Sequence, residues 1–411
     1  MTSLYDVRVT APGKVILHGE HSVLYNQFAV AGSLGLRTSL LIRELQPSSF
    51  GLTVNIEFPC VQLKCILSLD EIKNRLFESS NDCQTLWRTP ESLDHENHLY
   101  KVDNCFQSII CNIGQLNSVQ TNSLRCFLYI LSGIFGNTNI LDRSLKISVN
   151  SNLTVGAGTG SSASFAVCLS AALIQLMKLK SGTKAKEFND EDKTLISAWA
   201  YNCEKITHGT PSGIDNATCT YGSLVGFKKG EEPKLSTFQT KLRILLVDSK
   251  VSRETKMLVA KVAFLRLHNR LAVNSIMDAC GHIATSAYEI MEKLSAKDCQ
   301  DSEAHYNHLS ELWNMNHCLL ASLGVSHPSL EEIRAVAMMH GLACKLTGAG
   351  GGGYAIVLIP PTVEQTTVDA LRRILEGKGY TVKDTQLGGH GVLLEEIISR
   401  KCENKDEKKN K

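Results

Sequence analysis

The chain has 411 residues, of which 43% are hydrophobic and 20% charged, and its formal net charge is +2. Such a chain can bury the cores of two globular domains, and its near neutrality gives no electrostatic reason to expect nucleic acid or an anionic membrane as a partner. The N-terminal residues contain neither a basic leader nor an apolar stretch, so we expect no signal peptide. The fourteen cysteines lack CxxC spacing, which favours free thiols in a reducing, cytoplasmic compartment.

The first half of the chain begins with strand patterns. Short β-type runs at 7–10 and 15–17 precede alternating segments at 28–43 and 52–67. Residues 79–103 are polar and aperiodic, which predicts a long loop or lid.

Helix patterns follow further along the first half. A strand at 145–149 leads into a glycine-rich segment and a strong helix from Ser161 to about Lys178, and a second helix is predicted at 191–207. The apolar run at 163–177 is too short to span a bilayer and is interrupted by polar residues, so it predicts a buried helix.

The second half starts where the composition turns polar, near residues 230–233. We therefore expect domains at 1–232 and 233–398, followed by a charged, disordered tail at 399–411. The second half carries helix patterns at about 254–296 with breaks, 303–322, 329–340 and 366–376, and strand patterns at 244–247 and 354–359. Strands mixed with helices in both halves predict an α+β or α/β fold.

The strongest motif is the VGAGTGSSA segment at 155–163. Its alternating glycines, Gly156, Gly158 and Gly160, allow backbone N–H groups to turn toward one point without obstruction by a Cβ atom. The following helix adds its own N-terminal donors, so the segment predicts a phosphate-binding loop. The alternative is a glycine-rich turn with a serine helix cap.

Glu204 is the second candidate. Ile196, Ala200 and Glu204 lie on one line of the predicted helix, and a carboxylate on an apolar line is costly unless it is paired or binds a cation. The alternative is a surface pair with His208 or Lys205.

Asp215 ends the HGTPSGID segment, whose proline and glycines predict an irregular turn that could present the carboxylate from a loop. The alternative is an ordinary turn or cap residue.

Two further segments, at 11–21 and 345–353, are candidate binding segments. APGKVILHGEH at 11–21 contains two histidines and a glutamate, but its HxEH spacing matches neither HExxH nor HxxEH, so zinc is not expected. KLTGAGGGG at 345–353 precedes a strand, which indicates either close backbone approach to a ligand or to the first domain, or a hinge.

Together and in this order, APGKVILHGEH, GAGTGSSAS and KLTGAGGGG resemble the three motifs of the GHMP kinases, a superfamily of small-molecule kinases. HGEH and EKITHGTPSGIDN are most similar to the mevalonate kinase family of eukaryotic type, and the resemblance covers most of residues 5–395. It implies a two-domain α+β fold, with an N-terminal S5-like α/β domain and a C-terminal ferredoxin-like domain, and with ATP and substrate between them.

The resemblance also implies an activity, the ATP-dependent phosphorylation of the primary hydroxyl of mevalonate with Mg²⁺, in a homodimer that isoprenoid diphosphates can inhibit. The implied catalytic residues are Lys14 and Asp215, and the implied Mg²⁺ ligands are Ser162 and Glu204. The implied ATP-binding residues are Lys14, Ser151, Gly156, Ala157, Gly158, Thr159, Gly160, Ser161 and Ser162. The implied substrate-binding residues are Lys14, Glu20, His21, His208, Asp215 and Thr255.

Some residues depart from the family pattern: Thr154, Val155, Thr159 and Cys60. They bear on nucleotide affinity rather than on activity, because no implied catalytic group is lost. The alternatives are a phosphomevalonate kinase or another GHMP kinase, and a non-catalytic regulator, which would be expected to lack the charged groups present here. The substrate-side segments at 14–25 and 204–216 contain no arginine, which favours mevalonate over phosphomevalonate, and Arg253 is the residue that could alter this charge count.

Overall fold

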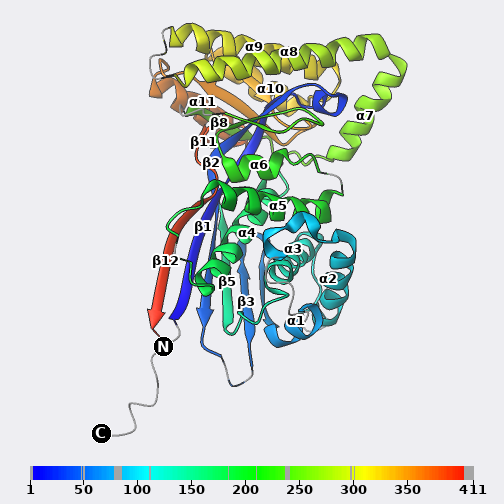
Figure 1. Cartoon of the computed structure of the whole chain (residues 1–411). Helices are drawn as coiled ribbons and strands as arrows, with labels where there is room; N and C mark the ends of the chain where they lie inside the picture. The colour runs from blue at the N-terminus through cyan, green and yellow to red at the C-terminus, as the bar shows by residue number, and fades with distance from the viewer. Residues whose placement is uncertain are drawn as a thin grey trace.

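A computed structural model describes residues 3–47, 49, 51–77, 86–110, 113–183, 185–209, 211–236, 241–296, 299 and 301–401. Figure 1 shows two lobes joined by a narrower waist. The N-terminal lobe contains β1, β3, β5 and β12 with α1–α5, and the C-terminal lobe contains β8 and β11 with α8–α11. Both lobes combine a sheet with helices packed on it.

The described residues form twelve strands of one sheet. The strands are β1 (Ser3–His18), β2 (Ala29–Leu45), β3 (Thr53–Phe58), β4 (Leu63–Ser68), β5 (Ser144–Ser151), β6 (Leu224–Phe227), β7 (Lys234–Leu235), β8 (Leu242–Asp248), β9 (Cys344–Leu346), β10 (Tyr354–Ile359), β11 (Thr381–Leu387) and β12 (Leu393–Lys401). The order β4-β3-β5-β2-β11-β8-β10-β9 runs through both lobes, and β1 lies between β2 and β12.

The helices cover this sheet. They are α1 (Leu69–Leu76), α2 (His95–Ile110), α3 (Ser118–Phe135), α4 (Ser161–Lys180), α5 (Asp190–His208), α6 (Ile214–Tyr221), α7 (Thr255–His268), α8 (Arg270–Leu294), α9 (Ser302–Ser322), α10 (Pro328–Met339) and α11 (Gln365–Gly377). Short 3₁₀ turns occur at η1 (Ser22–Tyr25), η2 (Pro59–Val61), η3 (Leu86–Arg88) and η4 (Pro90–Ser92).

The long strand β2 connects the lobes. Residues 38–45 pair with β5 in the N-terminal lobe, and Leu34 pairs with Leu387 of β11 in the C-terminal lobe. Its first six residues are all buried, whereas burial alternates in the last part of the strand, as expected where one sheet face is covered and the other is partly exposed. The two lobes therefore share a continuous sheet rather than a flexible linker.

Helix α4 forms the core of the N-terminal lobe. It is long and apolar enough to cross a membrane, but 83% of its apolar window is buried inside the protein. It packs against β1, β2 and α5, so the prediction of a buried core helix is confirmed.

Two sequence-based expectations differ from the structure. Part of the segment 79–103 is helical, because α2 begins at His95 and buries Val102, Cys105 and Phe106, whereas residues 79–85 lie outside the described residues. Of the predicted tail at 399–411, residues 399–401 belong to β12, and 402–411 lie outside the described residues. The boundary near residue 232 stays a prediction, although β12, from the second half of the sequence, pairs with β1 in the N-terminal lobe.

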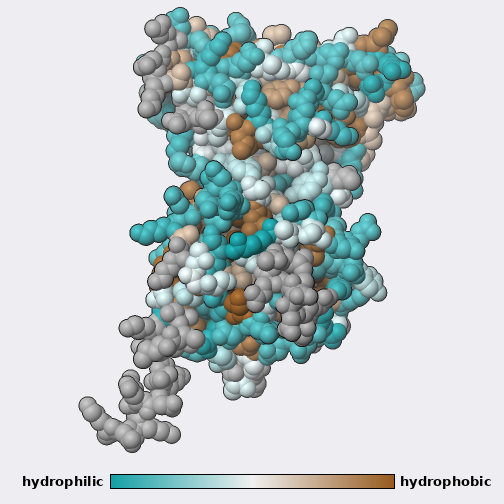
Figure 2. Space-filling model, viewed as in Figure 1, coloured by the Kyte–Doolittle hydropathy of each residue, from teal (hydrophilic) through white to brown (hydrophobic). Residues whose placement is uncertain are grey.

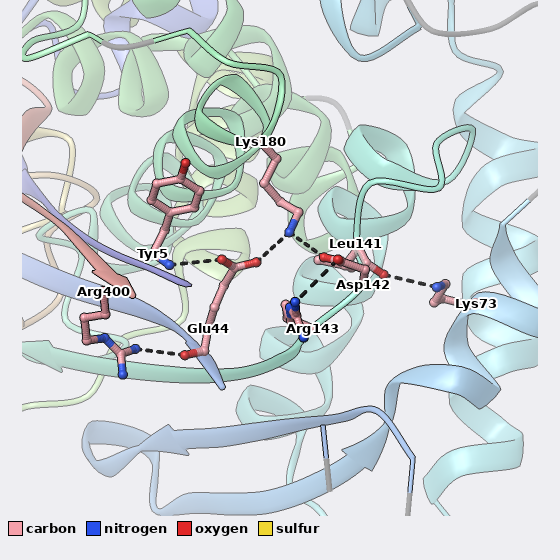
Figure 3. Close-up of polar contacts among 8 residues, drawn as sticks. All are labelled: Tyr5, Glu44, Lys73, Leu141, Asp142, Arg143, Lys180 and Arg400. Carbon is pink, nitrogen blue, oxygen red and sulfur yellow. Dashed lines mark hydrogen bonds and ion pairs between the residues drawn. The ribbon is translucent and has the colours of Figure 1, made fainter. Parts of the chain in front are cut away.

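A cluster of polar contacts surrounds the buried carboxylate of Glu44 (Figure 3). Glu44, at the end of β2, accepts hydrogen bonds from Lys180 Nζ (2.8 Å) and from the backbone N–H of Tyr5 (3.0 Å). Lys180 also contacts Asp142 (2.6 Å), and Arg400 of β12 donates to the carbonyl of Glu44 (2.9 Å). The contacts of this Glu44 cluster connect β1, β2, α4 and β12.

Candidate active site

A cavity of about 600 Å³ brings together residues from both halves of the sequence. Ten of the predicted site residues line it: Lys14, Ser151, Gly156, Gly158, Gly160, Ser161, Ser162, Glu204, Asp215 and Thr255. They come from β1, β5, the glycine loop with the start of α4, α5, α6 and the start of α7. The segments that the sequence singled out separately therefore meet in one place.

The glycine loop has the backbone that the motif predicts. Gly156, Gly158 and Gly160 have φ values of 77°, 78° and 70°, which residues with a Cβ atom rarely adopt. A Cβ atom on Gly160 would lie 2.7 Å from the side chain of Lys14. Gly160 caps α4, whose first N–H groups and positive dipole end lie at the cavity, as required for binding phosphate.

Lys14 is held between this loop and Asp215. Its backbone N–H donates to the carbonyl of Thr159 (2.9 Å), and its Nζ forms an ion pair with Asp215 (2.9 Å). The lysine side chain is 8% exposed and the aspartate side chain 33%. A cation fixed beside a phosphate loop and next to a carboxylate can stabilise a transferred phosphoryl group, while the carboxylate faces its acceptor.

Asp215 is not presented from a loop. It is the second residue of α6, whose N-cap is Gly213 in the left-handed region (φ 81°). The glycine turn thus ends at Gly213, two residues before Asp215, and the first turn of α6 sets the direction of the carboxylate.

Glu204 lies on the buried face of α5, as the spacing predicts, because Ile196 and Ala200 are fully buried. Burial, and then the negative charge of Asp215, raises the pKa of Glu204 to about 8, although Lys14 and the N–H of Asn216 act in the opposite direction. The carboxylate thus lacks full compensation from the protein. A divalent cation would supply it, and Ser162 offers a second hard oxygen ligand in the same cavity.

Other predicted residues lie outside the cavity lining. The carbonyl of Thr159 accepts from Lys14, and the carbonyl of Ala157 accepts from Arg253 Nη2 (3.4 Å). His21 is buried behind Ala349, to whose carbonyl its Nε2–H donates (2.8 Å). Glu20 is enclosed in a buried ion pair with Lys345.

One predicted residue cannot be assessed from its side chain. The side chain of His208 lies outside the described residues, although its backbone ends α5.

Arg253 is a cavity residue that the motifs did not include. Its guanidinium donates to the carbonyls of Thr347 (2.9 Å) and Ala157, and it passes directly over Gly158, where a Cβ atom would lie 1.7 Å from it. Arg253 therefore joins the glycine loop to the KLTGAGGGG segment. The only sequence signal for this role was its position two residues before Thr255.

The opposite end of the cavity is largely apolar. Phe58, Val61, Val119 and Phe165 line it, and Cys60 lies there beside the carbonyl of Ser151 (3.6 Å). Such a surface can hold a flat, uncharged group next to the phosphate loop. Helix α3, which contributes Val119, carries no motif, and in the 3₁₀ turn η2 the sequence indicated only Cys60, as a departure from the family pattern.

Comparisons with known proteins agree with this geometry. The chain matches the GHMP kinases N terminal domain over residues 124–223 and the GHMP kinases C terminal domain over residues 291–377, which defines its class. It is 35% identical to the mevalonate kinase of Bos taurus, over 95% of each chain, and 36% identical to that of Candida albicans, over 93% of this chain and 88% of the other. The chain therefore belongs to the mevalonate kinase family.

A solved structure supports the fold. The L. major mevalonate kinase in complex with R-mevalonate superposes with a TM-score of 0.62 at 21% identity, covering 93% of this chain and 96% of the other. The predicted two-domain α+β GHMP kinase fold is thereby confirmed.

Proposed function

We propose that the protein transfers the γ-phosphoryl group of ATP to the primary hydroxyl of mevalonate, giving 5-phosphomevalonate and ADP, an early step of isoprenoid precursor synthesis. The observation that carries the proposal is the meeting of the glycine loop, the Lys14–Asp215 pair and Glu204 in one cavity. The acceptor is inferred from the relatives, which are mevalonate kinases, one of them solved with R-mevalonate.

The glycine loop, Lys14 and Asp215 each have a separate role in phosphoryl transfer. The glycine loop and the N-terminus of α4 bind the phosphates, and Lys14 stabilises charge on the transferred group. Asp215 lies 2.9 Å from Lys14 Nζ, so an acceptor hydroxyl placed at this pair has a carboxylate to orient it or accept its proton. Positioning and charge stabilisation, rather than covalent chemistry by the protein, dominate such a reaction.

We also propose Mg²⁺ as the cofactor, held by Glu204 and Ser162. In the described residues no group of three or more His, Cys, Asp or Glu side chains could hold a metal alone, so phosphate oxygens and water would supply the other ligands. When bound, the ion would neutralise phosphate charge and compensate the buried carboxylate of Glu204.

We call the part of the cavity lined by Lys14, Asp215 and Arg253 the acceptor end, and its charges favour a substrate with one carboxylate. Lys14 is paired with Asp215, and Arg253 already donates to two backbone carbonyls. Lys205 lies over the ring of Tyr201, 4.9 Å from its centroid, and is not among the residues that line the cavity. We therefore expect kcat/KM for mevalonate at least about 10²-fold above that for phosphomevalonate, about 3 kcal/mol of transition-state discrimination.

The test is an ADP-release assay with mevalonate, phosphomevalonate, galactose and homoserine as acceptors. Preferred turnover of mevalonate is the expected result. Equal turnover of phosphomevalonate would mean that the charge count is wrong, and Arg253→Met would then be the first variant to make. Turnover of none of the four would refute the proposed reaction.

We infer three further properties from the family. Buried cysteines with free thiols, such as Cys168, Cys219 and Cys344, support a reducing, cytoplasmic location. Isoprenoid diphosphates are expected to inhibit in competition with ATP, because the apolar end of the cavity adjoins the phosphate loop.

A homodimer is the third property. Apolar side chains of Met257, Phe264 and Leu267 on α7 and of Leu271 on α8 are exposed, and Figure 2 shows apolar surface at this end of the C-terminal lobe. Light scattering on the purified chain measures the dimer directly, and a monomer at micromolar concentration would contradict it.

A further inference from the structure

A buried ion pair links the HGEH segment to the C-terminal lobe. Lys345 of β9 contacts Glu20, and neither side chain has any solvent exposure. Asn316 of α9 donates to the second carboxylate oxygen of Glu20 (3.1 Å), and Lys345 Nζ also donates to the carbonyl of Leu346 (2.7 Å). Both oxygens of Glu20 are thus engaged by the C-terminal lobe, and none is presented to the cavity.

The Glu20–Lys345 pair lies next to segments that line the cavity. His21 follows Glu20 and bonds to the carbonyl of Ala349, while Thr347 Oγ1 donates to the carbonyl of Ile16 (2.7 Å). Ile16, Gly348 and Ala349 line the cavity, and Gly348 lies beside the guanidinium of Arg253. The pair therefore lies where the first and third motifs are joined, at the acceptor end.

His21 has an unusual backbone that needs support. Its φ of 59° and ψ of −45° lie in a region that residues with a Cβ atom seldom adopt, so surrounding contacts must hold it. Burial, and then the charge of Lys345, keep the pKa of the neighbouring His18 well below its ordinary value, so His18 is not a second cation beside this pair. Lys345 is thus the group that compensates Glu20.

We propose that Glu20 and Lys345 are positioning residues, which fix the His21 turn and the Gly348–Ala349 segment and so shape the acceptor end of the cavity without touching the acceptor. A buried ion pair contributes little net stability compared with apolar side chains of similar volume, so a role in geometry accounts for it better than a role in stability alone. The proposal rests on the proposed function for the identity of the acceptor, and it replaces the expectation that Glu20 binds the substrate directly.

The test compares Lys345→Met, Glu20→Gln and the double variant Glu20→Gln/Lys345→Met. The matched control is Lys180→Met, because Lys180 also pairs with a fully buried glutamate but lies far from the cavity, in the Glu44 cluster (Figure 3). For each protein we would measure Tm, kcat, and KM for mevalonate and for ATP. Turnover of mevalonate by the wild type is checked first, so failure of the proposed function is recognised before any variant is interpreted; the variants are then compared with whichever acceptor the wild type uses.

In Lys345→Met the buried carboxylate loses its cation, so we expect Tm to fall by more than about 5 °C. KM for the acceptor should rise at least about tenfold, with KM for ATP within about twofold of wild type. The double variant carries no buried charge, so Tm should largely recover while KM for the acceptor stays raised. Lys180→Met should lower Tm without changing either KM. If Lys345→Met does not fold, Glu20→Gln and the double variant give the same comparison.

Two outcomes would overturn the proposal. Recovery of the acceptor KM together with Tm in the double variant would mean that the pair only stabilises the fold. A raised acceptor KM in Glu20→Gln, with unchanged Tm and with wild-type KM in Lys345→Met, would mean that Glu20 binds the acceptor itself.

Discussion

Two buried glutamates of the N-terminal lobe have opposite surroundings. Glu44 is fully buried, and its two oxygens receive Lys180 Nζ and the N–H of Tyr5. Glu204 is 6% exposed, and Lys14, whose charge lowers the pKa of Glu204, is ion-paired with Asp215. A carboxylate that the fold fully compensates marks a structural contact, whereas one left partly uncompensated beside a cavity marks a place for an external cation.

The largest expected difference is between substitutions of two similarly buried lysines, Lys14 and Lys180. Lys14 and Lys180 are 8% and 10% exposed, and each is paired with a carboxylate. Lys14→Met should lower kcat about 10³-fold with little change in Tm, because the lost charge acts on the transferred phosphoryl group. Thermal melting beside turnover is the measurement, and a joint loss of both would make Lys14 a structural residue.

Lys180→Met should show the reverse. Removing the cation leaves Glu44 buried without compensation, which should cost about 3 kcal/mol of unfolding free energy, while kcat stays within about twofold of wild type. Urea denaturation measures the stability. A variant as stable as wild type would show that the remaining donors to Glu44 suffice.

Asp215→Asn tests the acceptor side of the site. The amide keeps the shape but neither accepts a proton nor pairs with Lys14, so kcat should fall at least about 10²-fold while folding and ATP binding persist. A variant that retains more than about a third of wild-type kcat would end the assignment of Asp215 as a catalytic residue.

Of these variants, Glu204→Gln should change the stability of the fold least. It should also change how Tm depends on pH. Burial raises the pKa of Glu204 from its ordinary value of 4.5 to about 8, so the folded state holds this proton more tightly than the unfolded state. The contribution of this group to the stability of the folded state is therefore fully present below pH 4.5 and is lost as the pH rises through about 8. Mg²⁺ binds the ionised form, so it should raise Tm more at pH 8.5 than at pH 6.

In Glu204→Gln this pH-dependent effect of Mg²⁺ on Tm should disappear, and the Mg²⁺ concentration needed for half-maximal activity should increase. An unchanged Mg²⁺ titration would mean that Glu204 is a structural residue and that another group binds the metal.

Sequence patterns located much of the site because its signals are local. The glycine loop depends on three glycines with positive φ, and the buried face of α5 follows from Ala200 and Ile196, one and two turns before Glu204. Helix α2 was missed because its first four residues are polar and its buried residues begin only at Val102.

Long-range pairings could not be predicted in the same way. Glu20 and Lys345 are 325 residues apart, and nothing around Glu20 in the sequence indicates a buried partner. The role of Arg253 depends on the approach of the glycine loop and the KLTGAGGGG segment, which only the folded sheet brings together.

The pairing of β12 with β1 has a consequence for the order of folding. One edge of β1 is completed only by residues 393–401, from Ser3 opposite Lys401 to Thr10 opposite Leu393. During synthesis this edge of β1 therefore stays unpaired until nearly 400 residues have been made. An open strand edge is a template for pairing with other chains, so a product ending before β12 is expected to aggregate even though it contains every residue that lines the cavity.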